Sequence, residues 1–289
     1  MAETGLSRLR RAPLNKEEKG IYPFFRAELD WHQGKKDQAY KGYRQASRMV
    51  KEKYRRSAIY TRLAEYYALQ GDEQQAAANA RRSADILPHE PWKLVQVAGI
   101  YSNIGMNDKA IAGYKAALAL RPEPRTAANA LSGITEAYKT QNDKQNYLRY
   151  AREYVDTVRA SEPMFSTNEK GLAAFYQAEL YEAGSDPAKA FGSLKSASGL
   201  LTEKYRLSDT YVRMSRYQAR HGDPQLAGSY AESAAALLPD QIWRLQEAIG
   251  IFQETGNVEK AEIYARQSIS LYPAENGSVY QDLVVLHFR

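Results

Sequence analysis

The chain has 289 residues, 44% of them hydrophobic, with no cysteine and a formal net charge of +6. The lack of cysteine excludes disulfides, thiolate nucleophiles and cysteine-ligated metals. A sequence pI near 9.2 allows an acidic partner, but 34 acidic residues offset the 40 basic ones, which disfavours a dedicated nucleic-acid binder. No apolar stretch approaches the roughly 18 residues that a membrane-spanning helix requires.

The first residues, 1–19, are polar and basic and show no helical periodicity. We expect this segment to be a flexible lead-in, because chain ends without apolar contacts order poorly. Arg8, Arg10 and Arg11 are not followed by an apolar core, so the segment does not have the pattern of a signal peptide. The expected location is cytoplasmic, and a periplasmic location is the alternative if the sequence is a mature or excised piece.

From about Gly20 onward, the sequence is built from units of 34 residues. Four segments align without gaps on a glycine that is followed by alanine five places later and by proline seventeen places later. These glycines and prolines are Gly71, Gly105, Gly222 and Gly256, with Pro88, Pro122, Pro239 and Pro273. Before the glycine, apolar residues recur at the spacing of an amphipathic helix. Each unit is therefore predicted to be a helix, a glycine turn and a second helix that ends before the proline.

A longer period of 151 residues divides the chain into two homologous halves. Residues 51–110 and 202–261 share 24 identities in 60 positions, with Trp92 matched by Trp243. The first, fourth and fifth units are degenerate, and the fourth has Asn142 where the glycine belongs. Extra positions rich in turn-forming residues mark 161–170 as the predicted seam between the halves.

The third unit carries a specific order of large, small and turn residues at Leu94, Val97, Ala98, Tyr101, Gly105, Ala110, Tyr114, Ala117 and Pro122. This order resembles the consensus of the tetratricopeptide repeat (TPR) family, and the resemblance covers about residues 20–275. It implies an all-α fold, a TPR-type α-solenoid in which about seven helix-turn-helix repeats form a right-handed superhelix. Repeats 1–4 would occupy residues 20–160, and repeats 5–7 would occupy residues 171–275.

The last segment, 276–289, is predicted to be a C-terminal helix or the start of an eighth repeat. It contains the apolar run 283–288, whereas terminal repeats normally carry a polar outer face. We expect this end to pack back on the last repeat, to contact a partner, or to continue into more protein.

The sequence contains no motif that indicates catalysis. Phosphate-binding loops, dinucleotide-binding glycine clusters, nucleophile elbows and paired-histidine zinc helices are not found in it. The four histidines are far apart, and Asp223, near His221, is expected to cap a helix. We expect a non-enzymatic protein with no cofactor and no metal site.

The TPR resemblance implies that partners bind a concave face lined by the first helix of each pair. The candidate partner-binding residues on that face are Glu65, Trp92, Gly99, Asn103, Phe175, Arg216, Arg220, Trp243, Gln246 and Glu254. Trp92 and Trp243 are each followed by glycine seven places later, which suggests two equivalent ligand pockets. The alternative is that both tryptophans are packing residues inherited by duplication. The Lys/Asn clamp of TPR co-chaperones is absent, because Thr61, Glu65, Val95 and Gly99 occupy its places.

The leading functional hypothesis is a protein–protein interaction scaffold or adaptor that binds a peptide or protein segment in the groove. An acidic ligand is one option, because basic residues cluster at Lys51, Lys53, Arg55, Arg56, Arg62, Arg81 and Arg82, although a solvated helix face also explains them. The alternative function is a periplasmic TPR arm of a bacterial outer-membrane export or phage-adsorption protein, contacting polysaccharide or an envelope partner. RNA binding is a third and less favoured option.

Overall fold

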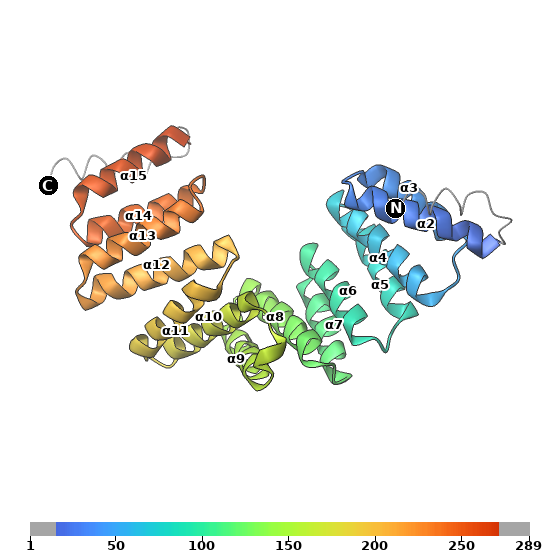
Figure 1. Ribbon diagram of the computed structural model, residues 1–289, viewed down its shortest axis with the longest axis horizontal. Coiled ribbons are helices and arrows are strands. Elements are labelled where there is room, and N and C mark those ends of the chain that lie inside the picture. The colour runs from blue at the N-terminus through green and yellow to red at the C-terminus, as the bar shows by residue number, and fades with distance from the viewer. Residues whose placement is uncertain (1–15, 272–289) are drawn as a thin grey trace. The chain divides into compact units, whose positions relative to one another are not determined.

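The computed structural model describes residues 16–271, and over that range the chain is α-helical without any strand (Figure 1). Fourteen α-helices follow one another as seven helix-turn-helix pairs within these residues. The pairs are α2 (Lys16–His32) with α3 (Lys36–Ala46), α4 (Lys53–Leu69) with α5 (Glu73–Ile86), α6 (Pro91–Asn103) with α7 (Asn107–Ala119), α8 (Pro124–Thr140) with α9 (Lys144–Ala160), α10 (Thr167–Ala183) with α11 (Pro187–Leu200), α12 (Lys204–His221) with α13 (Pro224–Leu237), and α14 (Ile242–Glu254) with α15 (Val258–Leu271). The predicted number and type of repeats are confirmed.

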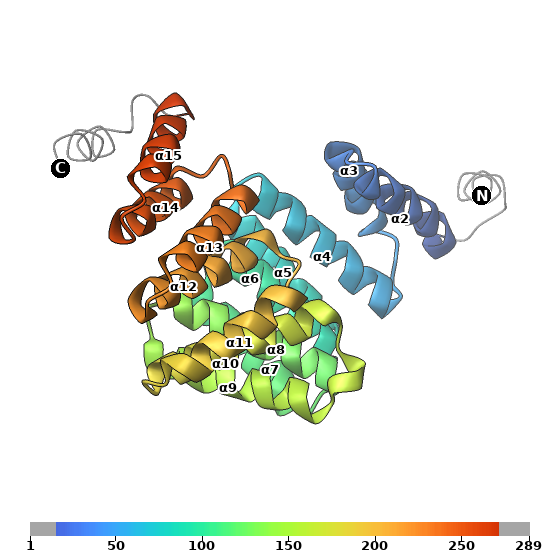
Figure 2. The ribbon, with the colours of Figure 1, turned by 60° about the vertical axis from the view of Figure 1, so that its left-hand side comes forward.

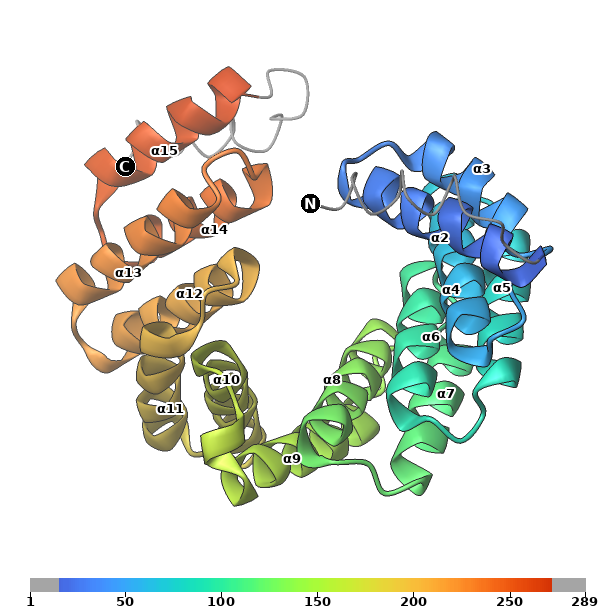
Figure 3. The same cartoon turned by 45° about the vertical axis from the view of Figure 1, so that its right-hand side comes forward.

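The chain divides into two compact units at the bond between Tyr150 and Ala151, inside α9. In the first unit, α4, α5 and α6 lie next to one another (Figure 2). In the second unit, α12, α13, α14 and α15 follow in order, each against the next (Figure 3). The predicted seam at 161–170 contains a short 3₁₀ helix, Glu162–Met164, between α9 and α10.

Each of the seven turns contains one residue with a positive φ angle. These residues are Gly34, Gly71, Gly105, Asn142, Ser185, Gly222 and Gly256, with φ between 57° and 97°. Asn142 and Ser185 take the place of glycine in the fourth and fifth units, which explains how those turns form without it. The residue after the turn often caps the second helix, and the Asp223 carboxylate accepts from the backbone N–H of Leu226, as predicted.

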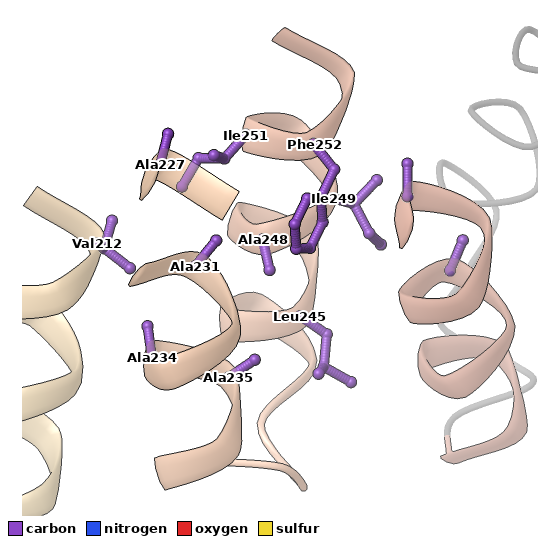
Figure 4. Close-up of a cluster of buried hydrophobic side chains, with 12 residues drawn as sticks. Val212, Ala227, Ala231, Ala234, Ala235, Leu245, Ala248, Ile249, Ile251 and Phe252 are labelled. Atoms are coloured by element: carbon purple, nitrogen blue, oxygen red, sulfur yellow. The ribbon is translucent and has the colours of Figure 1, made fainter. Parts of the chain in front are cut away.

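Small residues inside the pairs let the helices approach closely, and large residues fill the space between pairs. In the second unit, Ala227, Ala231 and Ala234 of α13 are fully buried in one cluster with Ala248 and Phe252 of α14 (Figure 4). This alternation of alanine and large apolar residues forms a core that runs from pair to pair.

The N-terminal prediction needs a correction, because α2 begins at Lys16 and the expected flexible segment ran to residue 19. Helix α2 forms although it contains Pro23, since its apolar face packs against α3. The ring of Tyr43 lies 6.4 Å from that of Phe24 and 6.2 Å from that of Trp31, centroid to centroid. The predicted C-terminal helix over 276–289 and the rest of the lead-in lie outside the described residues.

Candidate functional site

In the first unit, an open depression of about 430 Å³ lies on the face formed by first helices. Its lining comes from α2, α4 and α6 only, through Phe24, Phe25, Glu28, Ala58, Thr61, Arg62, Trp92, Lys93 and Gln96. Second helices contribute no lining residue to it. The depression therefore lies on the kind of surface that the TPR resemblance assigned to ligand binding.

The Trp92 side chain lines this depression and is held in a fixed orientation. Its side chain is 46% exposed, an unusual fraction for so large an apolar group. The indole Nε1 donates to a Glu90 carboxylate oxygen at 3.1 Å, and the Lys93 ammonium lies 4.7 Å from the ring centroid. A hydrogen bond at one edge and a cation–π contact together hold the ring in place.

Lys93 is the unexpected residue of this site, because it is only 2% exposed although it carries an amine. Its Nζ donates to Thr61 Oγ1 at 3.1 Å and to Gln96 Oε1 at 2.6 Å. Both acceptors are neutral, so burial dominates and lowers the pKa of Lys93 to about 8, with Glu65 opposing the shift and Arg62 adding to it.

In the second unit, 151 residues later, an exposed tryptophan again lies against a buried cation. Trp243 is 42% exposed, and its Nε1 donates to Gln241 Oε1 at 3.2 Å. Arg244, at the place of Lys93, is 2% exposed, and its guanidinium carbon lies 4.4 Å from the centroid of the Trp243 ring. Its Nη1 donates to Glu247 Oε2 at 2.5 Å. Burial lowers the pKa of Arg244, and the Glu247 charge opposes that shift.

An arginine on the neighbouring first helix links two carboxylates in each unit. Arg62 contacts Glu28 at 3.2 Å and Glu65 at 2.9 Å, and these partners raise the pKa of Arg62 although burial opposes its charge. Its counterpart Arg213 contacts Glu179 at 3.1 Å and also pairs with Glu182. The pair of this arginine with Glu28 or Glu179 is therefore common to both halves, whereas the second carboxylate comes from a different place in each.

The structure brings some of the sequence-predicted residues together and separates others. Arg216 and Arg220 are exposed on α12 and line one cleft. Gly99 is half-buried and Asn103 is exposed on α6, but neither lines the depression at Trp92. On α14, Gln246 is half-buried and Glu254 is exposed.

Phe175 is a correction to the predicted binding surface, because it is 1% exposed and therefore belongs to the interior. Its ring lies 6.2 Å from that of Tyr176 and 5.1 Å from the guanidinium carbon of Arg213. The corresponding place is also buried in α4 and α12, at Thr61 and Val212. That place is therefore largely covered in three of the first helices.

Sequence reasoning missed Lys93 and Arg244, because a charged residue in an amphipathic helix is expected on the solvated face. A usable signal existed, since a basic residue directly follows the tryptophan in both halves.

Within residues 16–271, the structure offers neither a metal site nor a membrane-spanning helix. No three histidine, aspartate or glutamate side chains gather there in a way that could hold a metal ion. None of the helices in this range combines the length and the apolar character needed to cross a membrane.

No protein-family model and no curated protein matches the sequence. The structure, however, is similar to solved TPR proteins. The match to a chain of the APC/C hetero-tetramer Cut9–Hcn1 covers 99% of this chain and 52% of that one, at 14% identity and a TM-score of 0.62, so this chain spans about half of its length. A TPR protein from Parabacteroides merdae matches over 93% and 99% of the two chains, at 16% identity and a TM-score of 0.63.

A third similar structure is PilW, a widely conserved type IV pilus biogenesis factor, with 79% and 98% of the two chains covered, 19% identity and a TM-score of 0.60. Identities this low carry information about the fold alone. The chain is an all-α solenoid of the TPR type, which confirms the family resemblance at the level of fold.

Proposed function

We propose that this protein is a non-enzymatic interaction scaffold that binds a peptide or protein segment on its first-helix faces. The observation that carries the proposal is the pair of equivalent tryptophans, Trp92 and Trp243. Each is nearly half exposed, and each is fixed by a hydrogen bond and an adjacent cation.

Fixed, exposed indoles suit binding for an energetic reason. Tryptophan is among the residues that most often dominate interface energies. A ring that is already held in one orientation loses little conformational freedom when a partner covers it. Packing within the array does not require either indole to stay exposed, so inheritance of a packing residue accounts less well for both sites.

The similar solved structures are compatible with such a role. One of them is part of a hetero-tetramer, and another is a factor in pilus biogenesis. We do not transfer either partner to this chain. Three predictions stay open: the cytoplasmic location, the periplasmic arm as its alternative, and the self-contact at 276–289. Fractionation of the native host tests the location, and the full-length gene shows what surrounds this sequence.

Affinity capture with purified variants tests the proposal. We expect Trp92→Ala and Trp243→Ala to weaken capture of the principal partner at least tenfold, because each removes an anchor. Ile263→Ala, which truncates a 54% exposed apolar side chain on the second helix α15, is the matched control and should bind as wild type. Equal capture by all four proteins, with unchanged circular dichroism, would refute the assignment of the site.

A further inference from the structure

A second open space, about 610 Å³, lies in the second unit between α11 and α12. Its inner lining is apolar and includes Ala190, Phe191 and Leu194. Its edge is formed by α12, which presents Arg213, Arg216, Tyr217, Arg220 and His221 at helical spacing. We call this space the α11–α12 cleft.

A stack of three rings forms one wall of the α11–α12 cleft. The Phe191 and Tyr217 rings are 4.4 Å apart at an interplanar angle of 15°, and the Tyr217 and His221 rings are 4.1 Å apart at 16°. His221 Nδ1 lies 2.8 Å from the Tyr217 carbonyl oxygen. That oxygen can only accept, so the contact requires a proton on Nδ1 and leaves Nε2 available to a ligand.

The arginines of the cleft differ in how far their charges are compensated. Arg213 is paired with both Glu179 and Glu182. Arg216 reaches Glu247 at 3.0 Å, but that same carboxylate also pairs with Arg244, so one acid serves two guanidinium groups. The Arg216 side chain remains 48% exposed.

Arg220 is the least compensated of the three. No acidic side chain pairs with Arg220 in the part of the chain that the structure describes, and Arg220 is exposed. The cleft therefore has a surplus of positive charge beside its apolar lining.

The first unit holds an internal comparison for this cleft. Tyr40 and Tyr66, at the places of Phe191 and Tyr217, are stacked at 4.3 Å with an interplanar angle of 17°. The stack is therefore part of the shared scaffold. The exposed arginines are not shared, because Glu65 stands in place of Arg216 and Leu69 in place of Arg220. The fold does not demand a cation at either place, and a separate reason is needed for Arg216 and Arg220.

We propose that the α11–α12 cleft binds an acidic peptide segment. Side-chain carboxylates of the ligand pair with Arg216 and Arg220, and a neighbouring aromatic side chain of the ligand packs against the wall formed by Phe191, Tyr217 and His221. A peptide fits better than a phosphate-dense polymer, because it offers an apolar side chain to the apolar lining, whereas Glu182 in that lining repels closely spaced anions. This inference rests on the proposed scaffold function and names the chemistry of one ligand.

The test uses a fluorescent peptide in which glutamates flank a single phenylalanine, blocked at both ends so that only side chains are charged. A second peptide has glutamine in place of every glutamate. Fluorescence anisotropy gives the affinity of the full chain for both peptides at low and high salt. We expect the acidic peptide to bind, its affinity to fall with salt, and the glutamine peptide to bind at least tenfold more weakly.

The decisive variant is Arg220→Leu, which installs the residue that the first unit holds at that place and should therefore fold. It should weaken binding of the acidic peptide about tenfold, the loss expected for one charge-assisted hydrogen bond. Arg266→Leu removes an equal charge from α15, where Arg266 is exposed and paired with Glu262, and should change the affinity less than twofold.

Four outcomes would overturn the cleft proposal. They are an unchanged affinity in Arg220→Leu, the same loss in Arg220→Leu and Arg266→Leu, equal binding of the two peptides, and tighter, Arg220-dependent binding of a single-stranded oligonucleotide of matched charge. If Arg220→Leu has no effect while Trp243→Ala abolishes partner capture, the cleft proposal fails and the scaffold function stands. If Trp92→Ala and Trp243→Ala capture normally while Arg220→Leu does not bind the peptide, the assignment of the binding sites to Trp92 and Trp243 fails instead.

Discussion

Lys93 in α6 and Arg244 in α14 occupy equivalent places, and each sets a buried cation against an exposed tryptophan. Their partners differ in charge, since Gln96 accepts from Lys93 whereas Glu247 accepts from Arg244. A buried charge beside a carboxylate is better compensated than one beside an amide. The first unit therefore keeps the same geometry with a less compensated cation.

The lowered pKa of Lys93 predicts a pH dependence of folding. Its pKa is about 8 in the folded chain and ~10.4 in an unfolded one. Between these values the unfolded chain holds more protons, so the free energy of unfolding rises with pH; at lower pH the cost of the buried ammonium remains in full. We expect wild type to gain stability relative to Lys93→Met from about pH 8 to pH 10, measured by urea denaturation.

The control for this measurement is Lys41→Met, which replaces an exposed lysine on α3. The free energy of unfolding of this variant should depend on pH in the same way as that of the wild type. Parallel trends for wild type and Lys93→Met would show that Lys93 does not lose its proton in this range.

Close contact between α7 and α8 predicts that Gly133 does not tolerate a side chain. A Cβ at Gly133 would lie 2.2 Å from Cζ of Tyr114, whose ring is buried and has little room to move. Gly133→Ala should therefore lower the free energy of unfolding by about 1–2 kcal/mol, even after the better helix propensity of alanine. Gly250→Ala is the control, since nothing lies within 4 Å of its Cβ; it should be neutral or stabilising. Chemical denaturation measures both, and equal effects would contradict the prediction.

Arg62 is predicted to be a structural as well as an electrostatic residue. It pairs with Glu28, which also accepts a hydrogen bond from the Tyr43 hydroxyl at 2.6 Å. Arg62→Met would leave Glu28 half-buried without its cation, and we expect a loss of about 1–3 kcal/mol in unfolding free energy. Arg81→Met, which breaks the exposed pair with Asp85, should cost less than ~0.5 kcal/mol. Thermal denaturation that ranks the two variants in the opposite order would refute the role of Arg62.

The two turns without glycine predict stabilising substitutions. Ser185 has a φ of 59°, a conformation that costs an ordinary L-residue about 1–2 kcal/mol. Ser185→Gly should raise the unfolding free energy by up to ~1 kcal/mol, because glycine removes that cost but adds backbone entropy to the unfolded chain. Asn142→Gly should gain less, since asparagine tolerates this region. The reverse substitution, Gly71→Ser, should destabilise; a gain in that variant would contradict the argument.

The repeats could be predicted because their signals are local. Gly71 and Pro88 mark a turn and a helix end through their own backbone restrictions, and the alanines mark a close approach between two helices. Asn142 was placed where the turn glycine belongs, but Ser185 was not predicted as a turn residue of positive φ, because serine adopts it only when packing on both sides holds the turn closed.

The candidate site could be predicted only in part. Trp92 and Trp243 were found because duplication preserved both. Phe175 was placed on the surface because a consensus position does not indicate which neighbouring helix covers it. Lys93 was missed because its burial depends on Thr61 and Gln96, which lie on two different helices.

Successive pairs contact each other through α3 with α4, α5 with α6, α11 with α12, and α13 with α14. Such contacts join segments that are close in sequence, and the chain has no cysteine to cross-link distant ones. Stretching the protein from its ends should then detach one pair after another, in a saw-tooth force trace, because each neighbour is held by its own contact area. When the force is released, a detached end pair can dock again on the neighbouring pair that has stayed folded. The array would then extend and recover under load without complete unfolding.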